Sequence, residues 1–479
     1  MLVNIRGTGE SEGYFQLLAP REIQDIYDAI EWIAAQPWCD GNVGMFGVSY
    51  LAMIQLSVAG ANPPHLKCIF APWGLTDMYR DMFYQGGVLS ARWLVHWATT
   101  SLTYGNIRPA NEVLDELGEQ KYKESASRLL REDKDIASVK QLADALSNPT
   151  TPVNAFMTSI LLKSLDGPYW EKRRPRYDQI RIPCYIGADW GNYGLHLRGA
   201  LRSWESIQST KRMIVGPPVY LDRPLYQMQY ESLRWFDHWL KGMDTGITKE
   251  KPIKLFVMGT NKWKEADEWP LPETKWTPFY LHENSLLSEK DYWPNEGSDS
   301  YFDSPWGRES LEYLSPTLVE DTEVIGPIVA NIFASTTDKE ILWSLRLFEL
   351  DQEEKRNILA AGWLRGSLRA VDEKRSKPWF PFHQYNNPEP LEPGKIYEFK
   401  IDIIPTAKLF RAGTKFGLRI SSTDLDPETP LGFLASTHLK RQYPARITVY
   451  HDDDHPSSLV LPITSGNLLG TFMSGGKFP

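Results

Sequence analysis

One stretch of the chain, residues 42–52, limits the fold more than any other. A short apolar run leads into Gly47-Val48-Ser49-Tyr50, and a helix-compatible run follows at once. Strand, Gly-x-Ser and helix in this order predict a nucleophile elbow, a tight turn that holds a serine hydroxyl at the carboxyl end of a strand. The positive end of the next helix would lie close to that hydroxyl. The complete pattern ends in glycine and this chain has Leu51 there, so a buried serine at a strand end is the alternative.

Predicted strands and helices alternate around this elbow. Pro20 opens an amphipathic helix in which isoleucines recur at helical spacing. The alternation predicts an α/β fold with a parallel sheet and crossover helices. The expected strands are residues 2–6, 42–46, 66–71, 182–187 and 212–216, and the expected later helices are residues 195–207 and 225–241.

Two segments depart from this alternation. Residues 82–177 read as irregular helix and loop, which predicts an inserted helical cap over the end of the sheet where the elbow points. Beyond Met243, short apolar runs separated by Gly, Pro, Asn and Asp predict an all-β sandwich of jelly-roll type, beginning with the run at 252–258. The predicted domains are therefore residues 1–243, with the cap at about 82–177, and residues 250–479.

Aromatic residues make up 12% of the chain, which is high, and several fall in the predicted cap. Aromatic side chains bury large areas and line apolar pockets. We expect Trp93, Trp97 and Trp170 to shape an apolar substrate pocket, and packing in a core is the alternative for each of them.

Charge and cysteine usage exclude several classes of function. The net charge of −9 and the lack of a Lys/Arg-rich run disfavour a nucleic-acid partner. Three scattered cysteines have no metal-ligand spacing and suggest no disulfide framework. The glycines at 7–13 lack the spacing of a nucleotide-binding loop, so we expect no phosphate site there. No motif in the sequence implies a metal or an organic cofactor. There is no long apolar run or leader pattern, and we expect a cytoplasmic protein without a membrane partner.

Motifs along nearly the whole chain resemble those of one family. They include Gly47-Val48-Ser49-Tyr50-Leu51, Phe236-Asp237-His238-Trp239 and Gly362-Trp363-Leu364-Arg365-Gly366, together with residues 6–13, 30–38, 71–81 and 449–457. The sequence is similar to the CocE/NonD hydrolases, the cocaine-esterase and X-prolyl dipeptidyl-peptidase family. The resemblance implies an α/β-hydrolase fold with a helical cap and a C-terminal jelly roll. It also implies a serine hydrolase that cleaves an ester or amide of a small molecule or short peptide through an acyl-enzyme at Ser49, with the Tyr50 N–H in the oxyanion hole.

The sequence offers two candidates for the acid of a catalytic triad. In this fold the triad follows the chain order Ser, Asp, His. The resemblance places the acid at Asn192, where an uncharged amide cannot act as a charged partner for the base. Asp189 precedes it by three residues near a strand end and is the other candidate.

The general base of the triad has no histidine at the position where the family carries it. The resemblance places it near Tyr220, and a phenol is a poor base at neutral pH. His196 at a helix start is the first substitute, with a structural role as its alternative, and His96 in the cap is a further candidate. His238 lies late in the last helix, where we expect it on a packing or interdomain face. Removal of a triad member costs about 10⁴-fold or more in rate, so either another residue substitutes or activity is low.

The beginning of the chain also departs from the family. Its members have further strands before the segment that here begins at Arg6, and one loop there supplies a tyrosine hydroxyl to the oxyanion hole. A parallel sheet without those strands would be uncovered on one flank, which points to an incomplete start or to a partner at that edge, and a homo-oligomer is compatible with this. The alternative function is a catalytically impaired hydrolase-fold protein that acts as a binding or scaffolding module.

Overall fold

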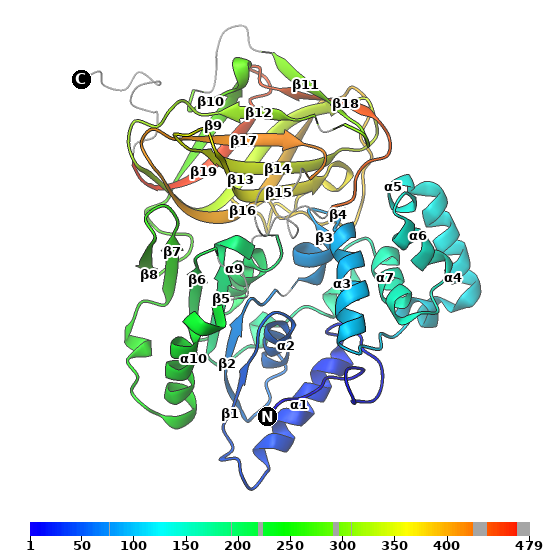
Figure 1. Cartoon of the computed structure of the whole chain (residues 1–479), viewed down its shortest axis with the longest axis vertical. Helices are drawn as coiled ribbons and strands as arrows, with labels where there is room; N and C mark the ends of the chain where they lie inside the picture. Colours follow the sequence, from blue (N-terminus) through cyan, green and yellow to red (C-terminus); the bar gives the residue numbers. More distant parts are fainter. Residues whose placement is uncertain are drawn as a thin grey trace.

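The computed structural model of the chain describes all residues except 76, 193, 219–223, 291–296, 308, 425–437 and 467–479. Figure 1 shows a β domain at one end of the molecule, a mixed α/β domain at the other, and a group of helices at the side. No helix among the described residues combines the length and the apolar character needed to cross a lipid bilayer.

The first domain is built on a six-stranded sheet. Its strand order is β1-β2-β5-β6-β7-β8, in which the first five strands run parallel and β8 is antiparallel. The strands are β1 (Val43–Phe46), β2 (Leu66–Pro72), β5 (Cys184–Asp189), β6 (Lys211–Gly216), β7 (Ile253–Val257) and β8 (Lys262–Ala266). The carboxyl ends of the parallel strands meet at one edge of the sheet, and this is the edge at which the elbow and the end of β5 lie together.

The crossover helices of this sheet confirm the predicted alternation. They are α1 (Pro20–Ala34), α2 (Tyr50–Ala59), α9 (Leu197–Ser206) and α10 (Pro224–Lys241). Helix α1 has proline in its first turn and buries Ile26 and Ile30, as its spacing predicts. Helix α10 packs on the sheet through Trp235, whose indole N–H donates to the backbone oxygen of Ile69 at 3.0 Å.

An inserted helical region lies between β2 and β5, where the sequence predicted a cap. It contains a short hairpin, β3 (Tyr84–Gln85) with β4 (Val88–Leu89), and several helices. The helices are α3 (Ala91–Tyr104), α4 (Glu112–Glu132), α5 (Lys134–Ala137), α6 (Lys140–Ser147), α7 (Pro152–Leu162) and α8 (Pro168–Glu171). In Figure 1, α4 to α7 form the group at the side of the molecule, and α3 stands between that group and α2.

The second domain is an all-β fold of the predicted jelly-roll type. Its strand order is β11-β18-β13-β16-β15-β14-β17-β12-β10-β9-β19, and β19 also pairs with β13, so the sheet closes on itself. The strands are β9 (Lys275–His282), β10 (Leu286–Ser288), β11 (Ser298–Asp303), β12 (Leu311–Leu314), β13 (Thr322–Thr336), β14 (Leu342–Leu350), β15 (Arg356–Arg365), β16 (Tyr397–Phe410), β17 (Lys415–Ser421), β18 (Ala445–Tyr450) and β19 (Ser458–Ser465).

The strand predicted at residues 2–6 is wrong, and the run at 252–258 pairs with a different sheet from the one predicted. Residues 2–6 form no strand: they are irregular, and Leu2 is 99% exposed, because no strand pairs with them in the described part of the chain. The run at 252–258 does not open the β domain, since β7 extends the first sheet in parallel with β6. The first sheet therefore continues to β8, past the predicted boundary at 243. The alternating burial of β7 is compatible with either sheet, so this pattern alone does not identify the partner strand.

Candidate active site

Ser49 lies on a nucleophile elbow, as predicted. It directly precedes α2, and its φ of 58° and ψ of −119° are unusual for a residue with a side chain. A Cβ on Gly47 would come within 2.5 Å of the Leu51 Cβ, so the turn requires glycine at that position. The chain accepts this strained conformation because strand β1 and helix α2 hold the turn from both sides. The elbow projects the serine at the carboxyl edge of the parallel sheet.

His196 is the basic side chain that the structure brings to Ser49. Its Nε2 lies 3.2 Å from the Ser49 Oγ, although the two residues are far apart in the sequence. Burial lowers the pKa of His196 to about 3, so the imidazole is neutral at pH 7. With the proton on Nδ1, Nε2 can accept the serine hydroxyl. The Nδ1 atom is buried and has no hydrogen-bond partner among the described residues.

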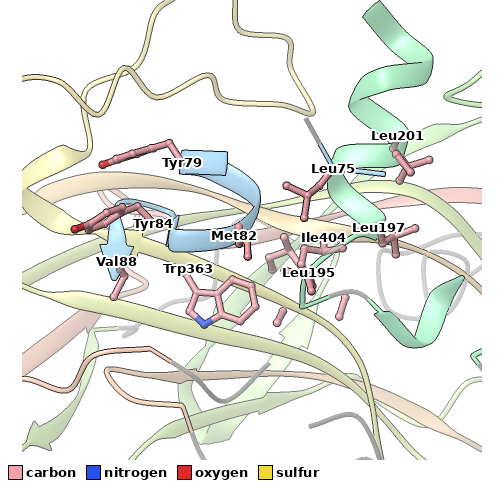
Figure 2. Close-up of a cluster of buried hydrophobic side chains, with 14 of the residues drawn as sticks. Leu75, Tyr79, Met82, Tyr84, Val88, Leu195, Leu197, Leu201, Trp363 and Ile404 are labelled. Carbon is pink, nitrogen blue, oxygen red and sulfur yellow. The ribbon is translucent and has the colours of Figure 1, made fainter. Parts of the chain in front are cut away.

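The position of His196 follows from the packing around the start of α9. Leu195 and Leu197 on either side of it are buried in a hydrophobic cluster that both domains share, and Figure 2 shows them beside Ile404, with Trp363 nearby. The His196 N–H also donates to the backbone oxygen of Asn192 at 3.2 Å. The sequence named His196 among several candidate bases, but this contact depends on tertiary packing that no local pattern reveals.

Asp189 lies at the end of β5 and is buried. Its Oδ1 accepts the backbone N–H groups of Gly191 at 2.8 Å and Asn192 at 2.9 Å, and its Oδ2 accepts the indole N–H of Trp73. Burial raises the pKa of Asp189 to about 6, against the opposing effect of these three neutral donors. Among the described residues, no hydrogen bond joins Asp189 to His196.

Asn192, the other candidate for the acid, is completely buried. Both polar atoms of its side chain lack a hydrogen-bond partner among the described residues. Unpaired buried amides are costly, and in a native structure each one calls for an explanation, such as a substrate group or an ordered water. Asn192 therefore lies next to His196 in the fold, and among the described residues nothing occupies the donor and the acceptor of its side-chain amide.

Tyr50 is the first residue of α2, so its backbone N–H has no partner within the helix. This N–H is suitably placed in the chain to contact an oxyanion formed at Ser49. The Tyr50 hydroxyl donates to Oε2 of Glu22 at 2.6 Å, a contact that the sequence did not predict. Trp73 was also overlooked as a contact of Asp189, although it is part of the family-like segment at 71–81.

The remaining candidates lie in different surroundings. Trp170 is 1% exposed, and its indole donates to the Lys163 oxygen at 2.7 Å, so it belongs to the packed aromatic core. Trp97 is half-buried, with its ring centroid 4.9 Å from that of Phe156, and Trp93 is half-buried on the same helix, α3.

His96 and His238, the two further histidines considered from the sequence, lie in other surroundings than His196. His96 is exposed on α3, and His238 uses its Nδ1 on the Met243 oxygen at the end of its own helix. Tyr220, near which the resemblance places the base, lies outside the described residues. Within the described ranges, no group of three or more His, Cys, Asp or Glu side chains is arranged to hold a metal ion.

Family comparisons agree with this architecture. Residues 1–219 match the model of the X-Pro dipeptidyl-peptidases of the S15 family, and residues 245–460 match that of the X-Pro dipeptidyl-peptidase C-terminal non-catalytic domain. Cocaine esterase of a Rhodococcus species is 26% identical over an alignment that covers 97% of this chain and 88% of that protein. A putative serine esterase of Mycobacterium bovis is 26% identical, with 96% and 82% covered.

Solved structures show the same fold. A CocE/NonD family hydrolase from Staphylococcus aureus superposes with a TM-score of 0.77 at 24% identity, covering 96% of this chain and 78% of that one. An alpha-amino acid ester hydrolase superposes with a TM-score of 0.72 at 16% identity, covering 96% and 84%. With both domains matched in order and the elbow in place, the chain belongs to the CocE/NonD hydrolases, the family of cocaine esterase and the X-Pro dipeptidyl-peptidases.

Proposed function

We propose that this protein is a serine hydrolase that cleaves an ester or amide bond of a small molecule or short peptide through an acyl-enzyme at Ser49. The observation that carries the proposal is the contact between Ser49 Oγ and His196 Nε2 at 3.2 Å on a strained elbow. A nucleophile and base within hydrogen-bond reach are what acyl transfer requires.

In this mechanism His196 Nε2 removes the proton from Ser49 as Oγ attacks the substrate carbonyl carbon. The carbonyl oxygen becomes an oxyanion and accepts the backbone N–H of Tyr50. Collapse of the tetrahedral intermediate breaks the bond to the alcohol or amine, which leaves with the proton from His196. A water molecule then attacks the acyl carbon while His196 takes its proton, and the bond to Ser49 Oγ breaks as His196 returns that proton to Oγ. The carboxylic acid is released, and Ser49 and neutral His196 are regenerated.

The surroundings of His196 predict slow turnover. A general base works best when its pKa lies near the working pH, and burial holds the pKa of His196 at about 3. Among the described residues, no carboxylate accepts a hydrogen bond from its Nδ1, so nothing there stabilises the imidazolium that forms.

The lack of a carboxylate at His196 Nδ1 among the described residues also supports a second candidate function. In this alternative the protein is a catalytically impaired member of the family that acts as a binding or scaffolding module. Asp189 directs its oxygens to Trp73 and two backbone N–H groups, an arrangement that fixes a loop without assisting a base. In that case the elbow would persist as part of the fold.

Labelling with a fluorophosphonate probe separates the two candidates. We expect the folded wild-type protein to react and the Ser49→Ala variant to show no labelling. Ser57→Ala is the matched control, because it removes another hydroxyl from the same helix, α2, and should label like wild type. Absence of Ser49-dependent labelling in a folded sample would overturn the enzyme proposal and favour the binding module.

A further inference from the structure

Glu22 is a buried carboxyl group that the mechanism does not use. It lies in the first turn of α1 and is 1% exposed. Its Oε2 accepts the backbone N–H of Leu18 at 2.5 Å and the hydroxyl of Tyr50 at 2.6 Å. One carboxylate oxygen therefore joins the entry to α1 with the residue that follows the nucleophile.

Both ends of this connection are conformationally unusual. Leu17 and Leu18 have positive φ values of 48° and 59° and are buried, which is rare for leucine. At the other end, Ser49 has its own positive φ of 58°. Such conformations persist where surrounding contacts hold them in place, and Glu22 contacts both segments.

Other groups keep the Tyr50 side chain from moving. The ring of Phe15 lies against that of Tyr50, with centroids 5.7 Å apart. Phe15 is itself fixed by backbone hydrogen bonds to Arg108 and Ala110. With its ring packed and its hydroxyl bonded to Glu22, Tyr50 has little freedom to rotate, and neither has the peptide that joins it to Ser49.

We infer that Glu22 is a positioning residue for the oxyanion hole: through the Tyr50 hydroxyl it fixes the orientation of the Tyr50 backbone N–H. The hydrogen bond between Glu22 and the Tyr50 hydroxyl is called the clamp below. Its catalytic consequence rests on the proposed function, but the clamp itself can be tested without catalysis. An oxyanion donor acts on the transition state rather than on the bound substrate, so loosening it lowers the rate constant of the chemical step and leaves binding unchanged.

The carboxylate lies in a mixed electrostatic environment. Burial raises the pKa of Glu22 to about 7, the hydrogen bond from Tyr50 opposes this, and Arg173 lowers the pKa while Asp25 raises it. Because charge-assisted hydrogen bonds are stronger than neutral ones, the clamp is tightest when Glu22 is ionised.

The first test measures the rate of Ser49 labelling by a fluorophosphonate. We expect Glu22→Ala and Tyr50→Phe each to lower the maximal labelling rate constant about 10- to 100-fold with unchanged probe affinity, since small misplacements at a site have effects of this size. The double variant should be no slower than either single variant, because both remove one interaction. Glu22→Gln keeps an oxygen acceptor and should restore the rate to within about threefold of wild type.

Asp28→Asn is the matched control. Asp28 is an exposed carboxylate on the same helix, and its Oδ1 accepts a hydrogen bond from Gln24 Nε2 at 2.8 Å. We expect its labelling rate to stay within about twofold of wild type, as for most surface changes. A Tyr50→Phe variant that labels as fast as wild type, or single variants whose effects multiply in the double variant, would overturn the inference.

Hydrogen exchange supplies a readout that does not need activity. Peptides covering residues 47–53 should exchange faster in Glu22→Ala and Tyr50→Phe than in wild type, and Asp28→Asn should leave them unchanged. Unchanged exchange in both clamp variants would overturn the inference even if the protein were inactive. A wild-type protein without Ser49-dependent labelling would refute the proposed function alone, and the exchange data would still decide whether the clamp exists.

Discussion

The two domains each bury an aspartate and a histidine, but they arrange the pair differently. In the β domain the side chains touch, since His438 Nδ1 lies 2.9 Å from Asp424 Oδ2. In the α/β domain His196 contacts Ser49 while Asp189 turns to neutral donors. Among the described residues, the Asp–His pair that is joined by a hydrogen bond makes no hydrogen bond to the candidate nucleophile, and the histidine beside the nucleophile has no carboxylate partner.

Their electrostatic surroundings differ as well. Burial alone would raise the pKa of Asp424, but His438 and Arg346 hold it well below its usual range. Burial raises the pKa of Asp189 to about 6, because its donors carry no charge to compensate. A contact between an aspartate and a histidine is therefore no sign of catalysis unless a nucleophile also contacts the histidine. Nor is a carboxylate near a nucleophile thereby part of a triad.

The largest expected effect tests the roles of the two histidines. His196→Ala should lower Ser49 labelling about 10⁴-fold, equal to about 5 kcal/mol in the barrier, because it removes the base. His438→Ala is the counterpart in the β domain and should label within about threefold of wild type. Equal losses in the two variants, measured in folded samples, would contradict the distinction drawn here.

A smaller effect is expected on stability when Asp424 is changed. Its Oδ1 accepts Ser344, the Trp363 indole and the buried guanidinium of Arg346, so Asp424→Asn removes the charge from the ion pair with Arg346. Breaking a buried ion pair costs about 3 to 5 kcal/mol of unfolding free energy, which urea denaturation would measure.

The control for that measurement is an exposed ion pair in the same domain. Asp321 binds Arg411 at 2.6 Å with both side chains about half exposed. Asp321→Asn should leave the urea midpoint where it is in wild type. A midpoint for Asp424→Asn that matches the control would show that the buried pair contributes nothing to stability.

The smallest expected effect concerns pH. Between about pH 4 and pH 6 the folded state keeps a proton on Asp189 that the unfolded state has lost, so this group favours folding at low pH and the benefit disappears as pH rises through 6. The stability of wild type relative to Asp189→Asn should therefore fall by about 2 kcal/mol between about pH 4.5 and pH 6.5. Urea denaturation at the two pH values measures it.

Asp424 gives the contrasting result. The pKa of Asp424 lies below pH 4.5 in both the folded and the unfolded state. Its carboxyl group should therefore cause no change with pH in the stability difference between wild type and Asp424→Asn from about pH 4.5 to about pH 6.5. His196, whose pKa burial lowers, contributes an opposite slope that is common to wild type and Asp189→Asn and cancels between them. A constant difference between wild type and Asp189→Asn would contradict the raised pKa.

Much of the fold could be predicted from the sequence, because its signals are local. Gly47 and Ser49 mark the elbow within a few residues, and proline and spaced isoleucines mark α1. Apolar character alone was misleading at residues 2–6, since a strand also needs a neighbour to pair with. The alternating pattern of β7 indicated a strand correctly and could not indicate which sheet it joins.

The site was less accessible to prediction, because its contacts join distant parts of the chain. Asp189 was correctly placed at a strand end, but its preference for Trp73 depends on how β2 and β5 pair. Glu22 looks like an ordinary acidic residue in the first turn of a helix, where the helix dipole favours one. Its second contact, with Tyr50, exists because α1 and α2 pack against each other.

The place of β7 in the first sheet matters to anyone who dissects this protein. A fragment ending at residue 243 would strip two strands from that sheet and expose the hydrogen-bonding edge of β6 along its whole pairing with β7. The two domains bond to each other just past β7. There the Met258 N–H donates to the Ala407 oxygen, and the Met258 oxygen accepts the Leu409 N–H, both in β16. These two backbone hydrogen bonds join the carboxyl end of β7, in the first sheet, to strand β16 of the β domain. Heat or protease should accordingly release neither half intact, and limited digestion would cut first in the exposed connections of the helical region.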